Sequence, residues 1–252
     1  MTASLFSGGA CSFLATHRYI KATDIRPVLL FSDTGVEDED LYRFVEDAVV
    51  FLDCPLVTVT SGETFDEMIA RHNALPSDRM PFCSQELKVA PAEKWLKDHP
   101  EIDTLIVGLD WTETHRLPKV ERRYPNHKVL APMMDKPYCM KSEMLADITA
   151  LGIKPPRLYD LGFSHNNCGG GCVRNGHRDW KRLHDVMPER FKQWAERESL
   201  IDGFSFSRDR RGGESKPYTL LRMAADWCNG EEPSLFDHGG CGCFVDDAGD
   251  SA

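Results

Sequence analysis

The sequence has no apolar run that approaches the roughly 18 consecutive residues needed for a membrane-spanning helix. It also begins without the basic region and apolar stretch that mark a secretory signal peptide. We therefore expect a cytoplasmic protein that does not enter a membrane. Disulfides are rare in that reducing compartment, so the nine cysteines of the chain are expected to bind a metal or to perform thiol chemistry.

An excess of positive charge is lacking as well, because the formal net charge is −10. This balance argues against a general electrostatic attraction to nucleic acid. A local basic surface stays open as an alternative in residues 205–222, which a solvated loop explains equally well. That segment contains Arg208, Arg210, Arg211, Lys216 and Arg222.

The length of 252 residues suits one α/β core with a smaller C-terminal lobe. Short apolar runs at residues 3–6, 27–31, 56–60 and 104–107 alternate with helical patterns near residues 12–19, 37–52, 64–71 and 91–99. This alternation predicts an α/β fold, a three-layer parallel sheet with helices on both faces. After about residue 130 the sheet pattern fades, so we expect a nucleotide-binding domain at 1–160 and a small irregular cysteine-rich lobe at 161–252.

Three turns fall at the ends of predicted strands, where ligands bind in open parallel sheets. They occupy residues 7–12, 32–35 and 108–116. In the first, Ser7, Gly8, Gly9 and Ser12 stand between a strand and a helix. Glycines there let backbone N–H groups approach an anion, and the helix adds its positive end. The Gly-Lys-Ser/Thr ending of a Walker loop is absent, so this is a different kind of phosphate site.

The stretch from Phe6 to Ser12 resembles the Ser-Gly-Gly-x-x-Ser pyrophosphate loop of the adenine nucleotide alpha-hydrolase fold, and most closely that of the phosphoadenosine-phosphosulfate (PAPS) reductase family. Four further stretches resemble motifs of that family in the same order along residues 3–175. They are Asp33-Thr34-Gly35 with Glu37; Cys83 with Leu87-Lys88 and Pro91; Gly108 with Glu113 and Arg116; and Leu158-Tyr159-Asp160 with Gly162-Phe163, leading to Cys168.

The resemblance implies an enzyme that binds ATP or a related adenine nucleotide. Ser7, Gly8, Gly9, Ser12 and Gly108 would contact the nucleotide, and Asp33 would position Mg²⁺ or the ribose. The loop departs from the family in having Ala10-Cys11 where many relatives carry Lys-Asp. We therefore expect the missing cation to come from Lys88 or Arg116, with Glu113 also in the catalytic set.

Two further expectations concern residues near these motifs. The thiol of Cys11 lies beside a helix N-terminus, which can lower the pKa of a cysteine, although a purely structural role is the simpler interpretation. The acidic run Glu37–Asp40 is expected to be a solvated helix start, because carboxylates favour that end of a helix.

The cysteines form two close pairs in glycine-rich segments, Cys168/Cys172 and Cys241/Cys243. Relatives that reduce adenylyl sulfate hold a [4Fe–4S] cluster between a pair at the position resembling Cys83 and a second pair resembling Cys168/Cys172. Here Ser84 follows Cys83, so Cys241 or Cys243 could complete the ligand set, and the other thiol of that pair would stay available to attack or carry sulfur. The resemblance to tRNA-thiolating relatives implies an alternative, in which three protein ligands leave one iron open to bind sulfide. Zinc bound by four thiolates is the less favoured alternative.

Three functions remain in consideration. The first is an ATP pyrophosphatase that adenylates an acceptor for sulfur transfer, as in nucleic-acid thiolation or DNA phosphorothioation, with a sulfur donor such as a cysteine desulfurase. The second is a sulfonucleotide reductase that releases sulfite, although the Glu-Cys-Gly-Leu-His segment of those enzymes is absent. The third is a subunit that binds nucleotide and cluster without turnover.

Overall fold

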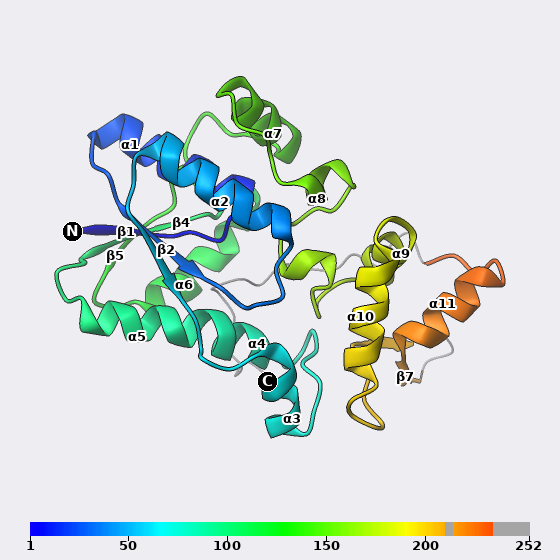
Figure 1. Cartoon of the computed structure of the whole chain (residues 1–252). Coiled ribbons are helices and arrows are strands. Elements are labelled where there is room, and N and C mark those ends of the chain that lie inside the picture. Colours follow the sequence, from blue (N-terminus) through cyan, green and yellow to red (C-terminus); the bar gives the residue numbers. More distant parts are fainter. Residues whose placement is uncertain (210–213, 234–252) are drawn as a thin grey trace.

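A five-stranded sheet forms the centre of the computed structural model, which describes residues 1–209 and 214–233 (Figure 1). Every neighbouring pair in it is parallel, in the order β3-β2-β1-β4-β5. Four of these strands lie where the sequence predicts them, and the short fifth strand was not predicted. The strands are β1 (Thr2–Leu5), β2 (Val28–Ser32), β3 (Leu56–Val59), β4 (Thr104–Val107) and β5 (Lys128–Leu130).

Helices cover both faces of the sheet, which confirms the predicted three layers. Side chains alternate along each strand, so Leu29 and Phe31 face one layer while Leu30 faces the other. The first layer consists of α1 (Ala10–Thr23), α2 (Glu39–Leu52) and α7 (Lys141–Ala150). The second consists of α5 (Ala90–Asp98) and α6 (Leu117–Arg123).

Several shorter helical elements connect the strands and the longer helices. They are α3 (Phe65–His72), α4 (Phe82–Ser84), the π-helical turn η1 (Gln85–Val89), the 3-10 turns η2 (Trp111–Arg116), η3 (Pro132–Met134) and η4 (Cys168–Gly170), and α8 (Arg157–Asp160).

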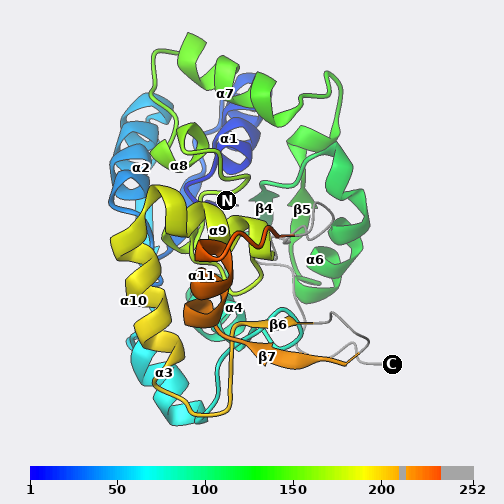
Figure 2. The ribbon, with the colours of Figure 1, turned by 90° about the vertical axis from the view of Figure 1, so that its right-hand side faces the viewer.

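The described part of the C-terminal lobe is more regular than the sequence suggested. It contains α9 (His177–Val186), α10 (Pro188–Glu198), α11 (Leu220–Cys228) and an antiparallel hairpin of β6 (Ser207–Asp209) and β7 (Lys216–Tyr218) (Figure 2). Trp180 and Trp194 are fully buried in its core, where Phe65 and Met68 of α3 also pack. The lobe therefore shares its core with the predicted nucleotide-binding domain.

No helix among residues 1–209 and 214–233 has both the length and the apolar character that crossing a membrane requires.

Candidate functional site

The loop between β1 and α1 is shaped by a left-handed glycine and by two hydrogen bonds of its serines. Gly8 adopts a left-handed backbone with φ of 71°, and a Cβ there would stand 3.0 Å from Leu41 Cγ. Ser7 Oγ donates to Ser12 Oγ at 3.2 Å, and Ser12 Oγ donates to the Gly9 carbonyl at 2.9 Å. Gly9 is the N-cap of α1 and has no side chain to cap it. The positive end of α1 is thus available to an anionic ligand.

The turn after β4 lies directly against this loop. A Cβ at Gly108 would be only 2.7 Å from both the Cα and the backbone nitrogen of Ser12, so glycine is required for the contact. Beyond it, the Asp110 carboxylate caps η2 by accepting from the Thr112 backbone N–H at 2.9 Å. Glu113 forms an ion pair with Arg116 and accepts from the Asp110 backbone N–H at 3.3 Å.

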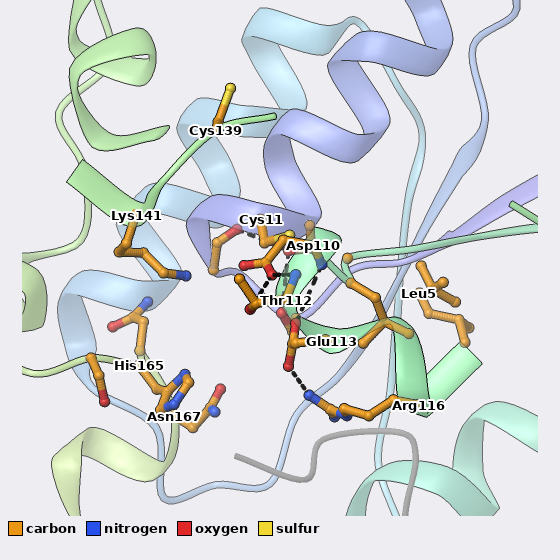
Figure 3. Close-up of a pocket in the computed structure, with 18 of the residues that line it drawn as sticks. Leu5, Cys11, Asp110, Thr112, Glu113, Arg116, Cys139, Lys141, His165 and Asn167 are labelled. Atoms are coloured by element: carbon orange, nitrogen blue, oxygen red, sulfur yellow. Dashed lines mark hydrogen bonds and ion pairs between the residues drawn. The ribbon is translucent and has the colours of Figure 1, made fainter. Parts of the chain in front are cut away.

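These two segments enclose a cavity of about 340 Å³ at the carboxyl ends of β1 and β4, which we call the nucleotide cavity after its expected ligand (Figure 3). It brings together six of the residues expected at the nucleotide: Ser7, Gly9, Ser12, Gly108, Glu113 and Arg116. Gly8 shapes the same loop from behind. The size is that of a small-molecule site.

Further lining residues come from segments that the sequence motifs did not place at the cavity. Lys141 reaches the cavity from the start of α7, and His165, Asn166 and Asn167 arrive from the segment before η4. Burial and the nearby Lys141 lower the pKa of His165, so its ring is neutral at pH 7. These groups come together because distant segments of the chain fold against each other, which local sequence patterns do not predict.

Two hydrogen bonds tie the later segments to the glycine loop. The Tyr159 hydroxyl accepts from the Ala10 backbone N–H at 3.2 Å, and the Asn166 amide donates to the Gly8 carbonyl at 3.0 Å. Tyr159 belongs to the Leu-Tyr-Asp stretch that carried part of the family resemblance, which is the one sequence signal that could have identified it.

Cys11 also lines the cavity, but its environment opposes a reactive thiolate. Burial raises the pKa of this thiol to about 12, with smaller contributions from nearby charges. The lowered pKa considered from the sequence is therefore wrong, because loss of hydration outweighs the helix N-terminus.

Lys88 and Glu37 form a buried ion pair away from the nucleotide cavity, with Nζ and Oε1 3.1 Å apart. The backbone carbonyl of Lys88 accepts from Ser32 Oγ at 2.9 Å, which holds η1 against the end of β2 and points the side chain to the start of α2. Asp33 accepts from Gly35 N–H and Tyr42 Oη, at 2.9 and 2.8 Å, and is likewise absent from the cavity lining.

The acidic run Glu37–Asp40 at the start of α2 is only partly solvated, since Glu39 is exposed as expected but the two residues before it are not. Glu37 and Asp38 are both buried. Asp38 caps α2 by accepting from the Asp40 N–H at 2.9 Å and forms an ion pair with Arg157 at 2.8 Å. Glu37 also accepts from the backbone N–H of Cys168. The start of the helix was predicted correctly. The carboxylates of Glu37 and Asp38, however, are bound by cations and a backbone N–H group from distant segments.

A second, smaller cavity, which we call the cysteine cavity, is lined by Cys83, Cys168 and Cys172 next to Lys88. A hydrogen bond between the thiols of Cys168 and Cys172, together with burial, raises the pKa of Cys168 well above its usual value. No set of three His, Cys, Asp or Glu side chains within the described ranges is arranged to hold a single metal ion. Cys241 and Cys243, expected to complete the ligands, lie outside the described residues.

The lining of this cavity nevertheless suits an iron–sulfur cluster. Its thiols can bind iron, and its buried hydrogen-bond donors can bond to the sulfurs of a cluster. Ser84 Oγ and Trp194 Nε1 line the same cavity and have no hydrogen-bond partner among residues 1–209 and 214–233. Cys168 has a positive φ of 51°, which is uncommon for a non-glycine residue and concentrates at functional positions.

A parallel sheet with a glycine loop and a cavity at its carboxyl edge defines an α/β protein of the PP-loop class. Residues 2–165 match the phosphoadenosine phosphosulfate reductase domain. The chain therefore belongs to that family. The adenine nucleotide alpha-hydrolase fold that was predicted from the five motifs is confirmed.

The individual proteins compared with this chain are distant from it in sequence. An uncharacterized protein of Methanocaldococcus jannaschii is 25% identical over 208 residues, which cover 79% of this chain and 43% of that protein. The chain thus spans less than half the length of this relative. A PAPS reductase structure from Candida auris has a TM-score of 0.49 and 18% identity, covering 64% of this chain and 78% of its own.

A U34-tRNA thiolase from Methanococcus maripaludis, solved with its [4Fe-4S] cluster, has a TM-score of 0.38 and 12% identity, and the match covers 80% of this chain and 72% of the thiolase. Likenesses of this strength do not by themselves assign a reaction.

Proposed function

We propose that this protein is a PP-loop ATP pyrophosphatase that adenylates an acceptor for sulfur transfer, of the nucleic-acid thiolation or phosphorothioation type. The observation that carries the proposal is the joint construction of the two cavities. The segment 164–168 contributes to the nucleotide cavity through His165, Asn166 and Asn167, and its last residue, Cys168, lines the cysteine cavity. Activation of an acceptor and delivery of sulfur would then occur at adjoining sites.

The adenylation step uses positioning and electrostatics. An oxygen of the acceptor attacks the α-phosphorus of ATP, the bond from that phosphorus to the bridging oxygen breaks, and pyrophosphate leaves with the electron pair. The acceptor releases its proton to solvent. The N-terminus of α1 and the glycine loop would hold the phosphates, and Arg116, oriented by Glu113, would offset charge that develops on the leaving group.

Cys83, Cys168 and Cys172 would hold the iron–sulfur cluster, together with Cys241 or Cys243. The thiol of Cys241 or Cys243 that is not a ligand would carry sulfur from the donor as a persulfide. Its terminal sulfur would bond to the activated acceptor while AMP leaves with the acceptor oxygen, and a thiol reductant would then cleave the remaining S–S bond. The chain's own contribution is to keep these thiols beside the nucleotide, since Glu37 binds the Cys168 backbone while Asn166 binds the glycine loop. A cysteine desulfurase is the class of partner that would provide the sulfur, and a nucleic acid is the proposed acceptor.

Sulfonucleotide reduction is the second candidate, because the family takes its description from that reaction. It requires a thiolate that attacks the sulfur of an activated sulfate. Among the described residues, the thiols that line the nucleotide cavity are Cys11 and Cys139. The raised pKa of Cys11 leaves very little thiolate at neutral pH. This argues against Cys11 as the attacking thiolate, and the sequence lacks the Glu-Cys-Gly-Leu-His segment of the reductases, so we favour adenylation.

The test is a pair of product assays on anaerobically purified protein. Release of pyrophosphate from ATP without sulfite release from activated sulfate supports adenylation. Sulfite release alone supports the reductase, and the absence of both products leaves a subunit that binds nucleotide without turnover.

Gly9 offers a matched pair of variants for the same assays. Its φ of −101° is open to any residue, and a Cβ there would meet the Tyr159 hydroxyl at 3.3 Å. We expect Gly9→Asp to abolish pyrophosphate release by placing a carboxylate in the phosphate site, whereas the uncharged, isosteric Gly9→Asn retains more activity. Equal activities of the two variants would count against phosphate binding by this loop.

A further inference from the structure

The charges around the nucleotide cavity leave one cation uncommitted. Arg116 is paired with Glu113, and Lys88 is paired with Glu37 outside the cavity. Lys141 lines the cavity and forms no ion pair or hydrogen bond within the described ranges. Figure 3 shows its amine directed into the cavity, toward Asp110 and Thr112.

We propose that Lys141 supplies the phosphate-binding cation that the glycine loop lacks. The loop has Ala10-Cys11 where many relatives have Lys-Asp, and Lys141 brings an ammonium group to the same cavity from a position 130 residues later in the chain. The ligand class is the polyphosphate chain of an adenine nucleotide. This inference rests on the proposed function, which requires that the cavity bind ATP.

The placement of Lys141 is unfavourable for a purely structural residue. It is the first residue of α7, where the positive end of the helix dipole repels a cation. Its ammonium group is also largely removed from water, and this burial opposes the charge. The pKa of Lys141 is nevertheless raised, and the carboxylates of Asp110 and Glu113 are the nearby groups that are negative at neutral pH, so the side chain is positive there. An anionic ligand would offset both costs.

Neighbouring contacts hold Lys141 in position. Arg18 of α1 donates to the carbonyl of Pro137 at 2.8 Å and to Cys139 Sγ at 3.0 Å, which anchors the segment before α7 onto the helix that follows the glycine loop. The Lys141 ammonium lies 5.8 Å from the centre of the Tyr159 ring. Because the Tyr159 hydroxyl also binds the Ala10 N–H, the cation and the loop share one support.

The experiment measures ligand affinity by calorimetry with three probes: ATP, inorganic pyrophosphate and adenosine. Lys141→Met keeps the length of the side chain and removes its charge. We expect it to weaken ATP and pyrophosphate binding by about 10- to 100-fold, the scale of one lost charge-assisted hydrogen bond, while adenosine binding stays unchanged. Lys141→Arg should retain most of the affinity for both phosphate ligands.

Lys192→Met on the exposed side of α10 is the matched control, since it changes the net charge equally and should leave all three affinities unchanged. If Lys141→Met binds ATP as tightly as the unmodified protein, or if it loses adenosine in the same proportion, the inference is overturned and the proposed function stands. If the unmodified protein binds neither ATP nor pyrophosphate, the proposed function itself fails.

Discussion

Gly108 shows how closely two backbone segments approach at the nucleotide cavity. Because a Cβ there would lie 2.7 Å from Ser12 Cα and N, Gly108→Ala must push the turn away from the glycine loop. We expect a loss of about 1–3 kcal/mol in the free energy of unfolding, the usual cost of overpacking, and at least about a 10-fold loss of ATP affinity. Urea denaturation and calorimetry measure these two quantities.

Gly152→Ala is a suitable comparison for that variant. Its Cβ would meet no atom within 4 Å, but its φ of 82° makes any side chain strained. Stability should fall by about 1–2 kcal/mol while ATP affinity is retained. An unchanged affinity in Gly108→Ala would show that the contact between the turn and the loop does not shape the phosphate site.

Single residues also show where sequence reasoning ends. Ser7, Gly9, Ser12 and Gly108 were placed from motifs that directly follow a strand with an evident apolar pattern. Lys88 also lies in a motif, but its backbone carbonyl accepts a hydrogen bond from Ser32 and its side chain forms an ion pair with Glu37. Lys141 stands in no motif. Its position depends on how residues 131–140 are folded against α1, which local patterns do not encode.

Among the elements, α10 ends on a buried acid that links three parts of the lobe. The carboxylate of Glu198 accepts from the backbone N–H of Phe206 at 2.9 Å and from that of Leu220, the first residue of α11, at 2.6 Å. Burial raises the pKa of Glu198 from 4.5 to about 7 despite these two donors. The folded lobe therefore favours the protonated carboxyl group of Glu198 over the carboxylate more than the unfolded chain does.

The free energy of unfolding should consequently depend on pH. Between pH 4.5 and 7 the folded chain binds more protons at Glu198 than the unfolded chain does, so stability falls as the pH rises and levels off above 7. The difference in pKa corresponds to about 3 kcal/mol. Urea denaturation from pH 5 to pH 8 measures the slope.

Glu198→Gln should remove this part of the slope. It should also lower the stability by an amount that does not depend on pH, because the amide NH₂ group would face one of the two backbone N–H donors. Glu196→Gln, an exposed position on the same helix, should retain the slope of the unmodified protein. A slope that persists in Glu198→Gln would assign the pH dependence to other groups.

The strands and helices differ in how much of them the sequence predicts. β4 was predicted to the residue because four apolar or β-branched residues follow one another in it. β5 has only three residues, none of them fully buried, and the β6–β7 hairpin is built largely from polar residues. Elements this short are stabilised by neighbours that the local pattern does not contain.

At the scale of the whole molecule, the cysteine cavity joins η1 of the nucleotide-binding part to η4 of the lobe. If it holds a [4Fe–4S] cluster, anaerobically purified protein should be brown and contain about four irons per chain. Serine variants at Cys83, Cys168 and Cys172 should each lose iron. Iron analysis and the visible absorption spectrum measure both expectations, and colourless protein with stoichiometric zinc would contradict the cluster.

Cys54→Ser and Cys228→Ser are the controls, since one thiol is buried in the sheet core and the other is exposed on α11. Both should keep the full iron content. Serine variants at Cys241 and Cys243, compared in the same way, would identify which of them completes the ligands.

The hydrogen bond from Asn166 to the Gly8 carbonyl has a consequence for how such proteins can be recombined. The match to the family ends at residue 165, one residue before this tether, while His165, Asn166 and Asn167 still form a wall of the nucleotide cavity. A lobe exchanged between relatives at that boundary would bring its own wall to a foreign loop. Viable chimeras should therefore take residues 164–168 together with the glycine loop, as one inherited unit.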